Sequence, residues 1–171
     1  MMKKNLLLFA LFAGFVTLAH AQSYEVLTEG SGRSYKGIFS REILEKDSTF
    51  KWYNENKSGY TPNAKAVTEL NKNADSVQLL VFMGTWCGDS HNIIPKFYTL
   101  LDSAGFSPEK VTLVGVDRSK KTSGHLAEAL NVKNVPTIIV LKNGKEAGRV
   151  VEYGKYGLFD IELAEILSSM K

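Results

Sequence analysis

Cys87 is the only cysteine of the chain, and it stands in the run Trp86-Cys87-Gly88-Asp89-Ser90. A strongly apolar stretch ends just before this run, and a helical pattern begins just after it. A thiol at a helix N-terminus faces unpaired backbone N–H groups, which favour the thiolate. The thiolate is the form that attacks disulfides. Ser90 occupies the place, three residues on, where a second cysteine would close an internal disulfide. These residues therefore predict a redox-type nucleophile without an internal partner.

Asp89 and His91 modify that prediction in different ways. The charge of Asp89, two residues from Cys87, opposes the thiolate, although its carboxylate would alternatively cap the new helix. His91 lies four residues after Cys87, so both side chains share a helix face. A Cys–His pair supplies too few ligands for a closed zinc site. We therefore expect no metal and no cofactor, and we interpret His91 as a surface residue of the helix and His125 as structural.

Residues 1–21 have the pattern of a secretory signal peptide. Lys3 and Lys4 precede an apolar run, and Ala19-His20-Ala21 is a small-x-small cleavage signal. The run is shorter than the ~20 residues that span a bilayer, which argues against a membrane anchor. We expect cleavage after Ala21, a periplasmic or secreted product, and no stable membrane insertion after cleavage.

The remaining chain has the composition of one globular domain, with 44% hydrophobic and 23% charged residues overall. Loss of the two signal-peptide lysines lowers the formal charge from +3 to +1. Lys120-Lys121 is the only adjacent basic pair after the signal peptide, and we interpret it as a solvated loop. A nucleic-acid partner needs a larger basic cluster, so none is expected.

The segment 22–60 is the less regular part. Short strands are predicted from Tyr24 to Leu27 and from Tyr35 to Phe39, around the turn Gly30-Ser31-Gly32. Phe50, Trp52 and Tyr53 supply apolar bulk for packing. We expect this segment to be an N-terminal extension packed on a domain formed by residues 61–171.

Residues 61–171 alternate between helical and strand patterns. Thr61-Pro62 is typical of a helix start. Strands are predicted at 77–83, 111–116, 137–141 and 147–153, the last two joined by a tight turn at Asn143-Gly144. Helices are predicted from near Cys87 to Ser103, over 123–130, and over the C-terminal residues. This order predicts an α/β fold with a parallel core, crossover helices and a hairpin at one edge.

The segment from Val77 to Lys171 resembles thioredoxin. The resemblance is carried, in register, by Trp86-Cys87-Gly88, Pro95, Val135-Pro136-Thr137 and Lys142-Asn143-Gly144. It implies a thioredoxin fold, with a central mixed sheet flanked by helices. It also implies that Pro136 is a cis proline facing Cys87, and that the backbone of Val135 pairs with an extended substrate segment. Trp86 would flank the same groove or serve as a half-buried packing residue.

Two departures from the thioredoxin pattern bear on mechanism. Ser90 replaces the resolving cysteine; its hydroxyl can hydrogen-bond the Cys87 thiolate but cannot attack a disulfide. Val81 replaces the buried acid that thioredoxins carry six residues before the nucleophile. The two losses agree, because a protein without a resolving thiol needs no group to deprotonate one.

Three functions remain open on the sequence. In the first, an enzyme of oxidoreductase or isomerase type exchanges disulfides through Cys87 alone, with protein clients or small thiols and disulfides as partners. In the second, a redox-inactive module binds clients through the cis-proline groove. The third, the least favoured, is a single-cysteine peroxidase; a monothiol glutaredoxin is a further variant of the first. Whether Cys87 links two copies into a dimer is left open.

Overall fold

The computed structural model describes residues 24–29 and 32–170. The predicted signal peptide, its cleavage site after Ala21, and the turn residues Gly30 and Ser31 lie outside this part of the chain. Among the described residues no helix combines the length and the apolar character needed to cross a membrane.

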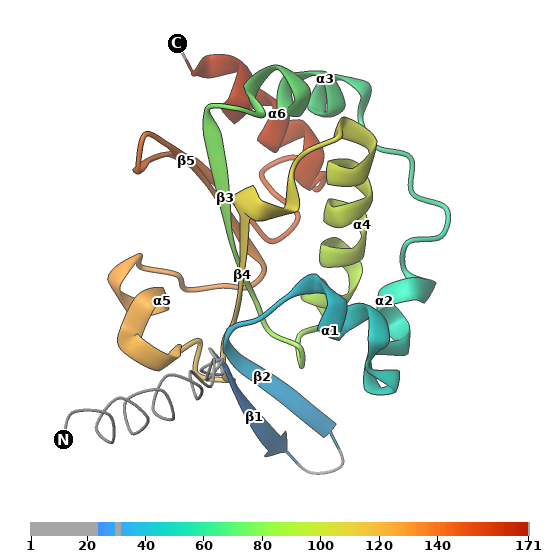
Figure 1. Cartoon of the computed structure of the whole chain (residues 1–171), viewed down its shortest axis with the longest axis vertical. Coiled ribbons are helices and arrows are strands. Elements are labelled where there is room, and N and C mark those ends of the chain that lie inside the picture. The colour runs from blue at the N-terminus through green and yellow to red at the C-terminus, as the bar shows by residue number, and fades with distance from the viewer. Residues whose placement is uncertain (1–23, 30–31, 171) are drawn as a thin grey trace, which may run out of the picture.

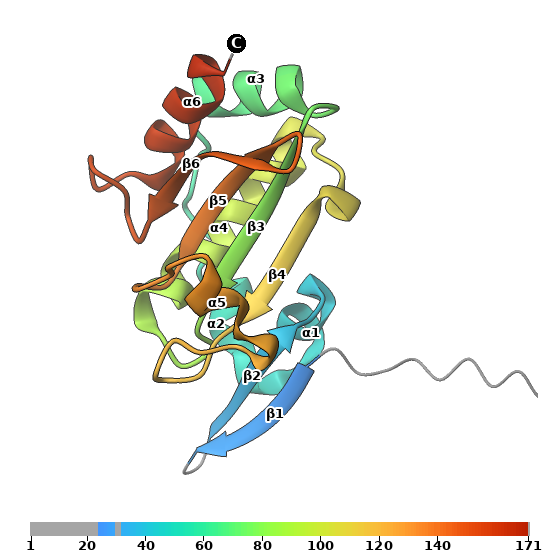
Figure 2. The same cartoon turned by 90° about the vertical axis from the view of Figure 1, so that its left-hand side faces the viewer.

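In the described part of the chain, six strands form a single mixed sheet in the order β1-β2-β4-β3-β5-β6, which Figure 1 views nearly edge-on and Figure 2 shows with all the strands labelled. The pair β3–β4 is parallel, and all other neighbouring pairs are antiparallel. The mixed sheet expected from the family resemblance is therefore confirmed. The strands are β1 (Tyr24–Glu29), β2 (Gly32–Ile38), β3 (Val77–Met83), β4 (Val111–Gly115), β5 (Thr137–Lys142) and β6 (Lys145–Val151).

The parallel core predicted from the order of elements is wrong for β5, which runs antiparallel to β3. The helix between β4 and β5 has only four residues. At about 1.5 Å per residue it rises about 6 Å, whereas a five-residue strand extends about 17 Å. Such a helix cannot carry the chain back along the sheet, so β5 starts at the end where β4 stops.

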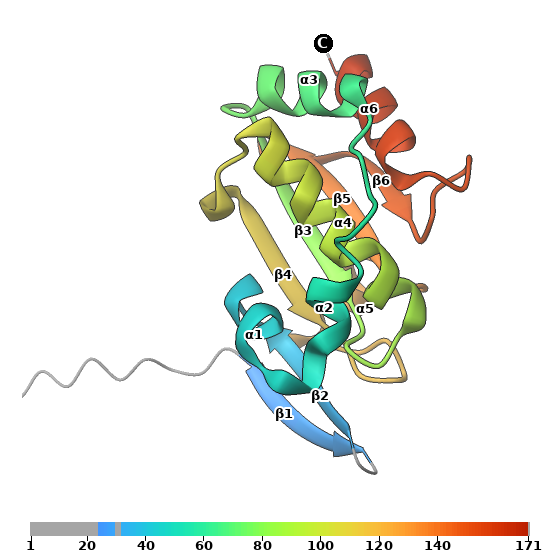
Figure 3. The same cartoon turned by 90° about the vertical axis from the view of Figure 1, so that its right-hand side faces the viewer.

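Helices cover both faces of this sheet. Figure 2 shows α5 in front of the strands, and Figure 3 shows α1, α2 and α4 over the opposite face. The α-helices are α1 (Arg41–Lys46), α2 (Lys51–Glu55), α3 (Ala64–Asn73), α4 (Gly88–Ala104), α5 (Leu126–Ala129) and α6 (Phe159–Ser169). Single 3-10 turns lie at Ser48–Phe50, Pro108–Lys110 and Ser123–His125.

Alternation along β3 builds two hydrophobic cores. Leu79, Val81 and Met83 pack into the larger core with α4 and α6, and Phe82 points into the smaller core under α5. Successive side chains of a strand point to opposite faces. The end of β3 is therefore fixed from both sides, and this end leads into the loop that carries Cys87.

Two helix predictions need correction. The predicted start at Thr61-Pro62 is wrong, because α3 begins at Ala64 and its N-cap is Asn63. The Asn63 side chain accepts hydrogen bonds from the amides of Lys65 and Ala66, which satisfies two of the free N–H groups of the first turn.

The single helix predicted over 123–130 is also wrong. Gly124 and His125 lie in the 3-10 turn Ser123–His125 and have positive φ angles of 71° and 57°, so this turn does not continue into α5 as one helix. In contrast, the predicted tight turn at Asn143-Gly144 is confirmed, with φ angles of 53° and 73°. The hairpin strand after it begins at Lys145, two residues before the predicted start at 147.

The N-terminal segment contacts the rest of the fold through strand β2 and through helix α2, among other places. Strand β2 pairs with β4, where Ile38 lies opposite Val114, and α2 packs against α4 (Figure 3). Phe50 and Tyr53 are buried in the larger core, as the packing interpretation predicted. Both contacts bring the segment close to the N-terminal end of α4.

Candidate active site

Cys87 is the N-cap residue of α4 and is partly exposed. Its carbonyl accepts the first hydrogen bond of the helix, from the amide of His91 at 3.0 Å. Its Sγ donates to the carbonyl oxygen of Val135 at 3.2 Å. The Val135–Pro136 peptide bond is cis. The thiol thus lies between the free N–H groups of a helix start and the loop before β5, and its ionisation breaks the contact with Val135.

Ser90 is fully buried in the first turn of α4, and its Oγ accepts a hydrogen bond from the amide of Gly84 at 3.2 Å. Ser90 accepts this bond because its side chain points back toward the loop, and the bond that it can donate to a Cys87 thiolate remains a prediction. Ser90 is therefore a structural residue that ties the helix start to the end of β3. Val81, buried in β3, is likewise apolar packing where thioredoxins carry an acid.

Trp86 is anchored rather than free beside Cys87. Its indole Nε1 donates to the carbonyl of Val116 at 2.9 Å, and the ring lies partly buried against the smaller core. A Cβ at position 84 would lie 2.7 Å from the indole carbon Cε2, so only glycine at that position leaves room for this ring. Trp86 is therefore a half-buried packing residue whose ring stays partly exposed, and its contact with a partner remains a prediction.

Gly88 and Asp89 occupy the first two positions of α4. The N-cap is Cys87, so the alternative in which Asp89 caps the helix is wrong. An acid in the first turn still favours the helix through the helix dipole. The Asp89 carboxylate therefore stabilises α4 and places a negative charge two residues from Cys87.

His91 is not a plain surface residue of the helix. Its ring stacks on Trp52 with centroids 4.1 Å apart and planes 14° apart, and its Nε2 lies 2.7 Å from the carbonyl oxygen of Thr85. Asn56 Nδ2 donates to the His91 carbonyl at 3.0 Å. The N-terminal segment therefore contacts the first turn of α4 on the side of His91.

Thr85 makes a second link to the N-terminal segment that the sequence did not reveal. The amide of Tyr35 donates to Thr85 Oγ1 at 3.1 Å, and the bond is buried. The two residues are 50 positions apart in sequence, and no local pattern indicates such a pairing. Together with the Trp52–His91 stack, this bond fixes the side of the active-site loop that faces the N-terminal segment.

Cationic side chains lie close to Trp86. Arg118 Cζ and Lys120 Nζ lie 5.3 and 5.9 Å from the ring centroid. Lys120 lies in a loop, as expected, and its ammonium reaches over the Trp86 ring. This loop is ordered by Asp117: burial acts to raise the pKa of its carboxyl, but hydrogen bonds from the Lys121 amide and the Lys36 ammonium hold that pKa below its ordinary value.

His125 differs from the expectation as well, since it is exposed and its Nδ1 lies 3.1 Å from Glu128 Oε1. Across residues 24–29 and 32–170, no group of three His, Cys, Asp or Glu side chains is placed to hold a metal ion. The described His91 contacts are to a backbone carbonyl and to an indole ring.

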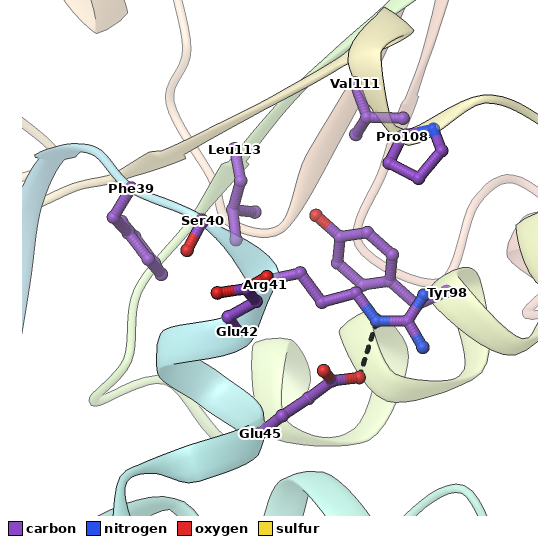
Figure 4. A pocket seen from close by; sticks show the side chains of 9 residues that line it. All are labelled: Phe39, Ser40, Arg41, Glu42, Glu45, Tyr98, Pro108, Val111 and Leu113. Carbon is purple, nitrogen blue, oxygen red and sulfur yellow. Dashed lines mark hydrogen bonds and ion pairs between the residues drawn. The ribbon is translucent and has the colours of Figure 1, made fainter.

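A larger hollow of about 380 Å³ lies between α1 and α4 and is lined by none of the predicted site residues. Figure 4 shows Arg41 across its centre, bonded to Glu45 and lying over Tyr98. Arg41 also binds Asp102 through both Nη1 and Nη2, and these contacts raise its pKa. This hollow is a polar junction between helices. It is lined by Phe39, Ser40, Arg41, Glu42, Glu45, Tyr98, Pro108, Val111 and Leu113.

Residues 61–160 match the family model for thioredoxin. The chain belongs to the thioredoxin family. A thioredoxin of Echinococcus granulosus is 34% identical over 87 residues, which cover 51% of this chain and 76% of that protein. The chloroplastic thioredoxin Y of Oryza sativa subsp. japonica is 31% identical over 81 residues, covering 47% of this chain and 45% of that protein.

Among solved structures, the thioredoxin of Fasciola hepatica is 26% identical, with a TM-score of 0.41, and the match covers 61% of this chain and 89% of that one. At the general level this thioredoxin-family protein is a thiol–disulfide oxidoreductase. The segment before residue 61, which supplies Tyr35, Trp52 and Asn56 to the site, lies outside the residues that the family model matches.

Proposed function

We propose that the protein exchanges disulfides through Cys87 alone, as an isomerase or as an enzyme that removes small thiols from mixed disulfides. The observation that carries the proposal is the pairing of a partly exposed Cys87 at a helix start with a buried, hydrogen-bonded Ser90. Cys87 is placed as an attacking sulfur, and Ser90 stands where a second thiol would resolve the mixed disulfide.

The proposed reaction has two steps. The Cys87 thiolate attacks one sulfur of a partner disulfide, so that a mixed disulfide forms and the other sulfur leaves as a thiolate. A thiol from outside, either of the client or of a small molecule, then attacks the mixed disulfide and releases Cys87. Each exchange is redox-neutral. Without a second cysteine in the chain, the lifetime of the mixed disulfide depends on that outside thiol.

Val135 and Pro136 are proposed to bind the partner. The Val135 carbonyl lies 3.2 Å from Cys87 Sγ, so a chain segment running along this loop presents its disulfide to the nucleophile. Trp86 adds a partly exposed aromatic surface beside the same sulfur.

We also propose a periplasmic or secreted location. N-terminal sequencing of the protein purified from cells tests this directly, with Gln22 as the expected first residue.

The proposal is tested by trapping adducts. The protein is purified from its natural compartment under acid quench, without reductant, and its intact mass is measured before and after dithiothreitol. Adducts that dithiothreitol removes, and that Cys87→Ser lacks, are expected; a Cys87-linked dimer would appear as one such adduct. A Cys87 that carries no adduct and resists alkylation would overturn the proposal. Client capture that is equally strong in Cys87→Ala would instead support the binding module.

Ser90→Cys provides the converse variant. It restores the residue that resolves the mixed disulfide in dithiol members of the family. We expect adducts to shorten in lifetime and an internal disulfide between Cys87 and the introduced thiol to accumulate. Ser90→Ala is the matched control, because it also removes the hydrogen bond to Gly84 but supplies no sulfur.

A further inference from the structure

A second hollow, of about 210 Å³, lies beside Trp86 and is formed jointly by the N-terminal segment and the active-site loop. We call it the Trp86 hollow. Unlike the larger hollow between α1 and α4, it is lined by Thr85 and Trp86 of the loop before Cys87 and by His91 in the first turn of α4. Its remaining lining residues are Gly32, Arg33, Ser34, Thr49, Phe50, Trp52 and Arg118.

The charge around this hollow is positive. Arg33 and Arg118 are the charged residues among the described residues that line it, and no acid is among them. Arg33 is 60% exposed and lies 3.7 Å from Asp47, whose carboxylate also accepts hydrogen bonds from Thr49 and Tyr35. An Arg guanidinium carries five N–H donors, so this single long contact leaves Arg33 with donors for an anion.

One residue that lines the hollow, Ser34, carries a buried polar atom without a partner. Ser34 is 2% exposed, and its Oγ makes no hydrogen bond in the described part of the chain. A buried hydroxyl without a partner costs about 1–3 kcal/mol. A ligand with an acceptor group that reaches Ser34 recovers part of that energy, which points to a polar group bound at this place.

The walls and the size restrict the ligand further. Trp52 and Trp86 supply aromatic walls, and the volume of about 210 Å³ is below the range of about 300–1,000 Å³ usual for drug-sized ligands. Positive charge, a hydroxyl donor and apolar walls in a small space suit a short carbon stem that ends in a carboxylate. Trp86, which lines the hollow, is the residue directly before Cys87 in the chain.

We propose that the Trp86 hollow binds the carboxylate of a small thiol and thereby selects anionic thiols as the outside thiol that resolves Cys87. This inference rests on the proposed function. The thiolate of the bound molecule attacks Cys87 Sγ, so that a new Cys87–small-thiol disulfide forms and the client leaves as a thiolate. A second molecule of the same thiol attacks the small-thiol sulfur, which releases Cys87 and a small-molecule disulfide. In total, two small thiols are oxidised and one client disulfide is reduced.

The test starts from Cys87 as a mixed disulfide with 2-thiopyridine, whose release is followed by absorbance. The resolving thiols are 3-mercaptopropionate and its methyl ester, which differ in the carboxylate charge. For each thiol the rate of a variant is divided by the rate of the wild type, so that intrinsic thiol reactivity cancels. Arg33→Gln and Arg118→Gln remove charge at the hollow, Arg33→Lys keeps it, and Lys46→Gln removes the same charge from an exposed site on α1.

With 3-mercaptopropionate we expect Arg33→Gln to lower the rate by about fivefold, as for a partly exposed ion pair, and the loss to shrink in ~1 M salt, where the screening length is about 3 Å. With the ester, and in Lys46→Gln or Arg33→Lys, the rate is expected to stay within about twofold of the wild type. Equal losses for both thiols, or none for either, would overturn the assignment. If no thiol releases thiopyridone, or if the mixed disulfide does not form, the proposed function itself fails.

Discussion

The two sides of the active-site loop are held by different parts of the chain. On the inner side, Cys87 contacts Val135 and Trp86 contacts Val116, all within the residues that the thioredoxin family model matches. On the outer side, Thr85 and His91 are held by Tyr35 and Trp52, which lie before the matched residues. The inner side contains Cys87, the proposed nucleophile, and the outer side does not. We infer that the N-terminal segment sets the position of the loop and the access to it.

The largest expected effect tests whether the outer side is an integral part of the fold. Phe50 is 2% exposed and contacts the rings of Tyr35 and Trp52. Phe50→Ala removes a buried ring and leaves a cavity, so the free energy of unfolding should fall by about 3–5 kcal/mol. Urea unfolding followed by circular dichroism measures the loss. Val26→Ala, at an exposed position in the same segment, should change it by less than about 0.5 kcal/mol.

A two-step unfolding curve in the wild type would contradict this view of the molecule. In that case the N-terminal segment would melt separately, and Phe50→Ala would shift only the first step. A single step that shifts as a whole means that the segment and residues 61–171 unfold together.

A smaller effect is expected at the hydrogen bond that joins the two parts. Thr85→Val keeps the shape of the side chain but leaves the buried Tyr35 amide without its acceptor, at a cost of about 1–3 kcal/mol. The Tyr35 amide hydrogen should exchange faster with solvent, which hydrogen-exchange NMR measures. Thr68→Val is the control, because Thr68 lies on the exposed side of α3 and bonds only within its own helix. Unchanged exchange at Tyr35 would show that this bond does not hold the loop.

The smallest expected effect is a pH-dependent change in stability at Asp47, which pairs with Arg33 at the Trp86 hollow. Hydrogen bonds from the Thr49 hydroxyl and amide hold the pKa of Asp47 below its ordinary value of 3.8. The ionised carboxylate therefore stabilises the fold above that ordinary value, and the contribution is lost as the pH falls through the lower, folded-state value. Asp47→Asn should be less stable than the wild type at neutral pH, and the difference should vanish in strong acid. Urea midpoints between pH 2 and about 7 measure it, and a difference that grows toward acid would reverse the sign.

The same division decides what the sequence could predict. The strand before Cys87, the turn at Asn143-Gly144 and the meeting of Cys87 with Val135 follow from local patterns and family resemblance. The order of elements predicts the wrong direction for β5, because it does not reveal that α5 is too short for a crossover. The predicted start of α3 at Thr61-Pro62 is wrong because Asn63, directly after the proline, caps the helix instead of Thr61.

The contacts of the outer side could not be read from the sequence. Trp52 was interpreted as packing bulk, and nothing in its neighbourhood indicated that it stacks on His91, 39 positions away in the printed sequence. The sequence likewise gives no sign that the Ser90 hydroxyl accepts a hydrogen bond from the Gly84 amide. In each case the partner is chosen by tertiary packing, which local residue patterns do not encode.

The two tryptophans of the chain both line the Trp86 hollow. One is stacked on an imidazole and the other directly precedes the reactive sulfur in the chain. The tryptophan fluorescence of the protein therefore originates from this one corner. Any change that a modified Cys87 or an occupied hollow causes at these two rings can therefore be recorded without an attached dye and without indole background from the rest of the molecule.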